Sequence, residues 1–311
     1  MKQPALHLRH PPESLQRKMT PAACYPKGTP ALGDKRVNRI LRAAVWVLFA
    51  AILYLIFTEA VWPWLKLPEL GNIGFTVVFV LFALAHCWSM EGGGRTATFF
   101  GISAIVSYAM EEIGVRTGLI YGPYHYSDML GAKLGHVPVL IPLAWFMMIY
   151  PSWRVAQAIL RGVDQSSILG NLARASVAAC VMTAWDTVMD PGMAAGHNWI
   201  WEKGGAYFGV PQRNYFGWLL TTFLVYAIFG FLRRRINKPV SATAGFAVMP
   251  VIVYAFFAVR YIASPWTPAL RVVALFAMGL PALLAVIRIG TLTKPSKTGI
   301  LSRNFGTDSS T

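Results

Sequence analysis

The stretch TATFFGISAIVSYAMEEIG, residues 96–114, has no charged side chain over its first fifteen positions and then two adjacent carboxylates, Glu111 and Glu112. An apolar window of this kind is typical of a helix that crosses the roughly 30 Å of hydrocarbon in a lipid bilayer. A charged carboxylate at the edge of hydrocarbon costs free energy, so the pair indicates a functional requirement as well as a membrane span.

Seven further windows of about 20 residues have the same character. They are Leu41 to Val61, Asn72 to Met90, Pro138 to Ala158, Ser167 to Met189, Tyr215 to Leu232, Ser241 to Tyr261 and Pro268 to Ile289. The 311 residues are 55% hydrophobic and 13% charged, with a mean hydropathy of +0.48, which is more apolar than an ordinary soluble domain. The sequence therefore predicts an all-α, polytopic membrane helix bundle of about eight transmembrane helices. In the window 138–158, Pro142 and Pro151 leave a kinked or partly re-entrant course open.

The net charge of +15 is distributed as a membrane topology signal. With a cytoplasmic N-terminus, 20 of the 28 basic residues fall on the cytoplasmic side and seven on the other, while Arg174 lies inside a span. This asymmetry and the even number of spans predict that both termini are cytoplasmic. The expected location is the bacterial cytoplasmic membrane, although an arginine-rich, acid-poor leader also fits a transit peptide. The proline-rich tail lacks the pattern of a nucleic-acid-binding segment, so no nucleic-acid partner is expected.

Composition divides the chain into three segments. Residues 1–38 and 294–311 are expected to be disordered tails, the first of them basic, and residues 39–293 form the transmembrane domain that would carry any catalytic site. Two connections, Val115 to Val137 and Pro191 to Asn214, are each longer than twenty residues and rich in glycine and aromatic side chains. Both fall on the non-cytoplasmic side in the predicted topology. Long connections in compact proteins are often functional, so both loops are expected to be structured.

Four acidic residues lie within or at the ends of apolar windows: Glu111, Glu112, Asp186 and Asp190. Asp186 and Asp190 are four positions apart and would share one face of a helix, whereas two adjacent glutamates point about 100 degrees apart, so that only one faces a given spot. A buried acid paired with a buried base is the requirement of proton-transfer catalysis. The alternative is structural, with the acids capping helices or pairing with Arg116, Lys203, Arg213 or Arg260.

Aromatic and polar residues accompany these acids along the sequence. Candidate substrate-binding residues are Tyr108, Tyr121, Tyr124, His125, Trp185, Tyr207 and Asn214. For most of the aromatics in these regions, including Tyr126, Trp199, Trp201 and Trp218, an interfacial aromatic belt is the favoured interpretation. A subset of aromatic faces would instead line an apolar tunnel and stabilise a cation.

No cofactor or metal is expected from the sequence. The histidines His86, His125, His136 and His197 form no pair with ligand spacing, and the three cysteines have no spacing typical of a zinc site or a disulfide framework. The segment GGGRTA, residues 92–97, fits a dinucleotide-binding fingerprint formally. It lies in a short turn between two predicted membrane helices, which is the wrong context for such a site.

Two blocks of sequence carry a resemblance to a known family. EEIGVRTGLIYGPYHYSDMLGAKLGHVPVLIPLAW (111–145) and DTVMDPGMAAGHNWIWEKGGAYFGVPQRNYFGW (186–218) resemble the carotenoid biosynthesis family of membrane proteins, over most of residues 40–290. Its studied members are carotenoid 1,2-hydratases, including the bisanhydrobacterioruberin hydratase type. The resemblance implies addition of water to the terminal double bond of an acyclic carotenoid end group without a redox cofactor. The implied partners are a carotenoid polyene of C30 to C50, membrane lipid and other enzymes of the same pathway.

The resemblance and the residues together predict a mechanism. One of Asp186 and Asp190 and one of Glu111 and Glu112 would form the acid–base pair, and the sequence leaves open which of the two donates the proton. Tyr121, Tyr124 and Trp185 would stabilise the cation, and Asn214 and His125 would position water. Two alternatives stay open: an isomerase or cyclase with the same protonation chemistry, and a proton-coupled carrier. The sequence does not specify the end group, the chain length or the oligomeric state.

Overall fold

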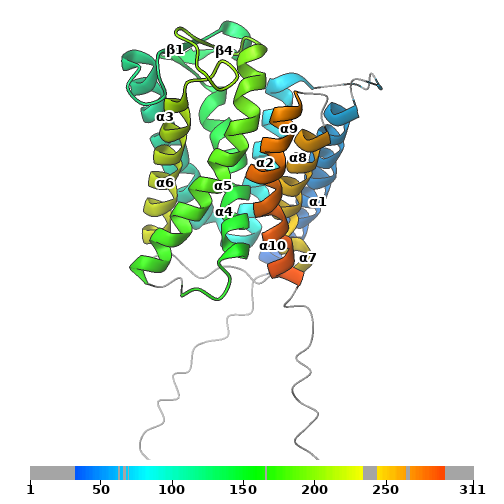
Figure 1. Cartoon of the computed structure of the whole chain (residues 1–311). Coiled ribbons are helices and arrows are strands. Elements are labelled where there is room, and N and C mark those ends of the chain that lie inside the picture. The colour runs from blue at the N-terminus through cyan, green and yellow to red at the C-terminus, as the bar shows by residue number, and fades with distance from the viewer. Residues whose placement is uncertain are drawn as a thin grey trace, which may run out of the picture. The chain divides into compact units, whose positions relative to one another are not determined.

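The computed structural model describes residues 32–61, 64–65, 68, 70–164, 167–233, 244–263 and 267–290, and most of these are helical (Figure 1). The helices are α1 (Leu32–Val61), α2 (Gly71–Glu91), α3 (Gly93–Thr117), α4 (Leu140–Ile159), α5 (Ile168–Ala195), α6 (Gln212–Arg233), α7 (Ala244–Ala247), α8 (Met249–Ala263), α9 (Pro268–Ala274) and α10 (Leu280–Gly290). A π-helical turn, Leu275–Gly279, joins α9 to α10. Residues 1–31 of the first predicted tail and all of the second lie outside the described residues, whereas residues 32–38 of the first tail belong to α1.

The predicted all-α membrane bundle is confirmed. Six helical segments are long and apolar enough to cross a membrane: Asn38–Val61, Gly71–Glu91, Gly93–Thr117, Ile168–Ala195, Gln212–Arg233 and Pro268–Gly290. The other two predicted spans correspond to α4, with 20 residues, and α8, with 15 residues. Helices satisfy their own backbone hydrogen bonds, and this is why apolar segments of such length fold as helices in hydrocarbon.

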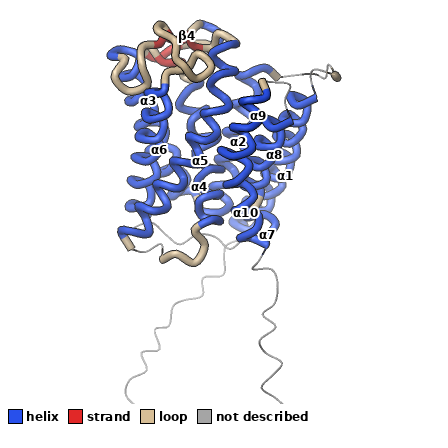
Figure 2. The backbone as a smooth tube through the Cα atoms, in the orientation of Figure 1, coloured by secondary structure: helices blue, strands red, loops and turns tan. Residues whose placement is uncertain are grey.

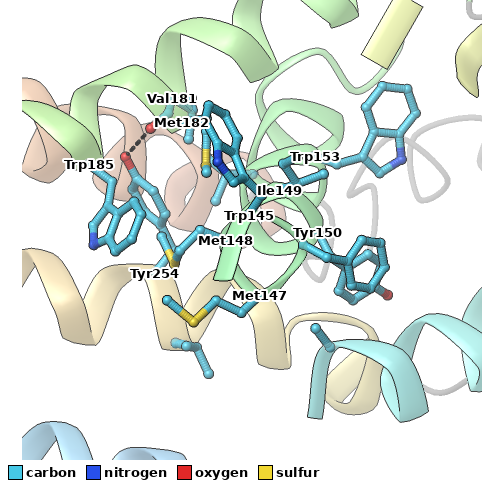
Figure 3. Close-up of a cluster of buried hydrophobic side chains, with 14 of the residues drawn as sticks. Trp145, Met147, Met148, Ile149, Tyr150, Trp153, Val181, Met182, Trp185 and Tyr254 are labelled. Atoms are coloured by element: carbon cyan, nitrogen blue, oxygen red, sulfur yellow. Dashed lines mark hydrogen bonds between the residues drawn. The ribbon is translucent and has the colours of Figure 1, made fainter. Parts of the chain in front are cut away.

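Helix α4 lies at the centre of the bundle and packs against α2, α3, α5, α8 and α10. Fourteen of its 20 residues are buried, so its surroundings are protein side chains, and it needs less hydropathy than a lipid-facing span. Trp145, Met148 and Trp153 of α4 belong to the buried cluster in Figure 3, where Tyr254 of α8 donates a hydrogen bond of 2.9 Å to the Val181 carbonyl of α5. The helix is continuous through Pro151, so no re-entrant course occurs.

The two long loops pair with each other at one end of the bundle, which we call the strand end (Figure 2). Strand β1 (Tyr124–Tyr126) runs antiparallel to β4 (Trp199–Trp201), with Tyr124 opposite Trp201 and Tyr126 opposite Trp199. A second small ladder joins β2 (Lys133–Leu134) to β3 (Val137–Pro138), after a 3₁₀ turn at Asp128–Leu130. Side chains alternate along a strand, so Tyr124 and Tyr126 are buried beneath the ladder.

Tyr121 fixes the first loop to the bundle. Glycine at position 118 ends α3 in the left-handed conformation, with φ of 66°, and turns the chain back over the helix. The Tyr121 ring then lies between Gly114 of α3 and Gly217 of α6, where a Cβ atom would approach the ring to 2.7 Å and 2.4 Å respectively. Its hydroxyl is 2.9 Å from Thr221 Oγ1. The loop therefore starts from a defined anchor.

Candidate active site

A cavity of about 320 Å³ lies beneath the paired loops. Its wall is mainly apolar and aromatic, with contributions from α1, α2, α3, α4, α5, α6, α8 and both strands of the ladder. Two acidic side chains from different helices line its inner part, Glu111 of α3 and Asp190 of α5. The size is at the lower end of the usual range for small-molecule sites, roughly 300 to 1,000 Å³.

Glu111 is held by three hydrogen-bond donors and is 4% exposed. Its Oε2 atom accepts from the hydroxyls of Tyr124 and Tyr126, the latter at 2.8 Å, and its Oε1 atom accepts from Trp145 Nε1 at 3.0 Å. Burial raises the pKa of both tyrosine phenols well above the usual value, and the adjacent Glu111 carboxylate raises it further. Both phenols therefore stay protonated and act as donors, and Glu111 is presented to the cavity as an acceptor.

Asp186 and Asp190 share one donor. Nδ2 of Asn214, on α6, lies 2.9 Å from Asp186 Oδ2 and 2.6 Å from Asp190 Oδ2. Asp190 Oδ1 accepts a second hydrogen bond, of 2.6 Å, from Trp199 Nε1 on β4. Asp186 Oδ1 is buried and has no hydrogen-bond partner among the described residues. Asp186 itself is fully buried, behind the cavity wall to which Asp190 contributes.

Aromatic faces surround the acids. Trp145 stacks on Trp218 with ring centroids 4.1 Å apart, and Trp185 meets Trp218 edge-on at 6.1 Å. Together with Tyr121 and Tyr124 these rings line the cavity. The negative faces of aromatic rings attract a cation at short range, which makes this wall suited to a positively charged intermediate.

The structure brings together seven of the residues that the sequence predicted for the site. They are Glu111, Asp186, Asp190, Tyr121, Tyr124, Trp185 and Asn214. Asp186 and Asp190 share one face of α5, as their spacing of four residues predicts, and both reach the same amide.

Four other predicted residues lie away from the cavity. Glu112 lies on a different face of α3 from Glu111. Its carboxylate accepts a hydrogen bond from Arg116 Nε at 2.7 Å and contacts the backbone nitrogen and Nδ1 of His136, each at 2.9 Å. His125 points outward from β1, with its side chain 53% exposed and 3.6 Å from Glu202. The hydroxyls of Tyr108 and Tyr207 bind backbone carbonyls, those of Leu134 and Thr187.

Three donors to the acids were not singled out by the sequence analysis. The sequence favours an interfacial belt for Tyr126 and Trp199 and does not single out Trp145, yet all three donate hydrogen bonds to the acids. The position of Tyr126, two residues after Tyr124 and hence on the same strand face, is a signal that could have found it. Trp145 comes from α4, 34 residues from its partner Glu111, and only the packing of α3 against α4 reveals the contact.

The described residues contain no group of three or more histidine, cysteine, aspartate or glutamate side chains that could hold a metal ion. A helix bundle with buried carboxyl groups around an aromatic cavity at one end defines a polytopic membrane protein with a candidate acid–base site.

Comparison with known proteins agrees with this class. The family described as carotenoid biosynthesis protein matches residues 71–287, and the chain belongs to that family. A curated relative, the bisanhydrobacterioruberin hydratase of Haloarcula japonica, is 30% identical over 215 residues, which cover 64% of this chain and 69% of the relative. No solved structure matches the chain. The matched region includes Glu111, Asp186, Asp190 and the two long loops.

Proposed function

We propose that this protein adds water to the terminal carbon–carbon double bond of an acyclic carotenoid end group. The observation that carries the proposal is the convergence of Glu111 and Asp190, from two helices, on one aromatic cavity, with Asp186 bound to the same amide as Asp190. The named activity of the relative, a hydratase, supports the same reaction class. Such a site can move protons to and from carbon without a cofactor.

The proposed reaction starts with proton transfer from the Asp186–Asp190 pair. Two carboxyl groups bound by one amide repel each other when both are charged, so the pair holds a proton, and Asp190 presents it to the cavity. The proton adds to carbon 2 of the end group, the π bond breaks, and carbon 1 becomes a tertiary cation. Water attacks carbon 1 and releases a proton to a carboxylate. The net change is one water molecule added across the double bond.

Glu111 is the proposed base. Its three donors hold it as an acceptor at fixed orientation, and it lines the cavity on the α3 side, whereas Asp190 lines it from α5. The charged carboxylate also stabilises the cation before water attacks. The stacked pair of Trp145 and Trp218 supplies aromatic surface for the same purpose.

The substrate is proposed to reach the site from the membrane. We infer that the strand end is on the non-cytoplasmic side and that both termini are cytoplasmic, since the basic residues favour this orientation. A carotenoid dissolved in the bilayer would insert its acyclic end beneath the paired loops, where the apolar wall excludes bulk water from the acid.

Expression in cells that make an acyclic carotenoid, followed by mass spectrometry of the pigments, tests the proposal. We expect a pigment heavier than its precursor by one water molecule, and a second such gain where the molecule has two acyclic ends. A product of unchanged mass would indicate cyclisation or isomerisation instead. Unaltered pigments across several acyclic substrates, with the protein present in the membrane, would contradict an enzymatic function.

A further inference from the structure

The cavity has an open end and a closed end. Glu59 of α1, Asn72 of α2 and Arg260 of α8 line it where these three helices end or begin, at the strand end (Figure 1). The side chains of Arg260 and Glu59 are 20% and 28% exposed, and Asn72 is exposed as well. Glu111 and Asp190, by contrast, are 4% and 1% exposed. The cavity therefore leads from a polar mouth to the buried acids.

Polar groups connect this mouth to Asp190. Arg260 Nη2 is paired with Glu59 Oε2 at 2.8 Å, and Asn72 Nδ2 donates to Asn198 Oδ1 at 3.0 Å. Asn198 is 4% exposed and directly precedes Trp199, whose indole binds Asp190. We call Glu59, Arg260, Asn72 and Asn198 the polar wall. Other parts of the lining are apolar, including Phe75, Ile141, Ala144, Met147, Met189 and Phe257.

The two kinds of wall suit two different substrates. A cavity lined by hydrocarbon stays dry, because a buried water needs two to four polar partners. An isoprenoid end group needs only the apolar surface. A hydratase of this kind needs an apolar surface and a binding place for water in one chamber. The polar wall supplies carboxylate, guanidinium and amide groups to which water can hydrogen-bond between the mouth and the acids.

We infer that the polar wall admits and holds the water that captures the cation, and that it thereby determines that the product is an alcohol. This inference rests on the proposed function. A tertiary cation at carbon 1 has two fates. It forms a carbon–oxygen bond with water and passes a proton from that water to a carboxylate, or it loses a proton from a neighbouring carbon to the carboxylate and becomes an alkene again. Depleting the wall of water favours the second fate.

Membranes containing the protein and an acyclic carotenoid, incubated in deuterated water, distinguish these fates. The acid then delivers deuterium, so a cation that reverts leaves label in the recovered alkene, and one that is captured gives labelled alcohol. For Asn72→Leu, and for Glu59→Leu combined with Arg260→Met, we expect the ratio of alcohol to labelled alkene to fall about tenfold, the size expected when hydrogen bonds to charged or amide groups are lost. Replacing both members of the ion pair removes both of its charges together, so neither is left without the other.

Arg271→Met is the matched control. Arg271 is on α9 at the strand end and donates to the Ile262 carbonyl at 2.8 Å, outside the cavity lining, so its ratio should equal that of the unmodified protein. An unchanged ratio of alcohol to labelled alkene in both wall variants would overturn the inference. Loss of both the alcohol and the labelled alkene would also overturn it, because it would show that the polar wall is needed for protonation. If the double variant fails to insert into the membrane, the product ratio of Asn72→Leu alone tests the inference. Absence of alcohol and label from the unmodified protein would instead refute the proposed function, and the inference with it.

Discussion

Glu111 and Glu112 are adjacent in the sequence but occupy opposite kinds of environment. Adjacent residues of a helix point about 100 degrees apart. Glu111 is therefore held by three aromatic donors, whereas Glu112 is paired with Arg116 and His136 outside the cavity. The roles proposed for the two residues differ accordingly. Of the two glutamates, only Glu111 lines the cavity.

This difference gives a paired prediction for single substitutions. Glu111→Gln keeps the shape of the side chain but removes its capacity to accept a proton, so conversion of the carotenoid should fall by a factor of about 100 or more. Glu112→Gln removes a partner of Arg116 and His136 and should leave conversion close to normal. Pigment conversion per amount of membrane-inserted protein is the measurement. Equal losses in both variants would contradict the assignment of the base.

At the level of the residue, spacing predicted part of the site. The interval of four between Asp186 and Asp190 and the adjacency of the two glutamates follow from helix geometry, which is local. The shared donor Asn214 comes from another helix, and Trp145 from a third. Such contacts depend on how helices pack against each other, and no periodicity within one segment encodes them.

At the level of the element, hydropathy predicted the helices better than the connections. Every predicted span corresponds to a helix, because backbone groups in hydrocarbon leave few alternatives. The prolines in α4 left its course open, and the helix is continuous through Pro151 with most of its residues buried in the bundle. The pairing of β1 with β4 joins segments about 75 positions apart in the chain, and strands of three residues are too short for alternation to identify their partner.

The contact between the first loop and α6 can be tested through a glycine. A Cβ atom at position 217 would lie 2.4 Å from Tyr121 Cδ1 and 2.8 Å from the Ile120 carbonyl oxygen, and neither can retreat without moving the loop. Gly217→Ala should therefore destabilise the protein by about 1 to 3 kcal/mol, as overpacking does. Thermal unfolding in detergent is the measurement.

Gly101→Ala is the control for this experiment. Gly101 lies within α3, and a Cβ atom there would have no neighbour within 4 Å. Alanine in a helix interior is more favourable than glycine by roughly 0.5 to 1 kcal/mol, so this variant should melt at the same temperature or higher. A Gly217→Ala variant as stable as Gly101→Ala would show that the loop is not held against α6 as described.

At the level of the whole molecule, buried polar groups occur both at the strand end and on the opposite side of the bundle. The cavity and its acids lie at the strand end. On the opposite side of the bundle, Glu91 is bound by Arg95 at 3.1 Å and by Arg233 at 3.0 Å, and His86 binds Tyr150 and the Phe246 carbonyl, each at 2.7 Å. A carrier needs a polar pathway from both faces, and on this side Glu91 and His86 are each held by contacts with other protein groups.

The size of the cavity leads to a prediction about substrates. About 320 Å³ is small for a site that would have to enclose a long polyene, so the proposed function requires that only the acyclic end enters and the rest of the molecule remains outside. Two carotenoids with the same acyclic end, one of them cyclised at the far end, should therefore be converted at similar initial rates. Altering the reacting end by one methylene-sized group should change the rate about tenfold or more, as it does in apolar pockets. Initial rates on purified carotenoids in liposomes measure both effects, and a strong dependence on the far end would show that the protein encloses more of the chain than this cavity holds.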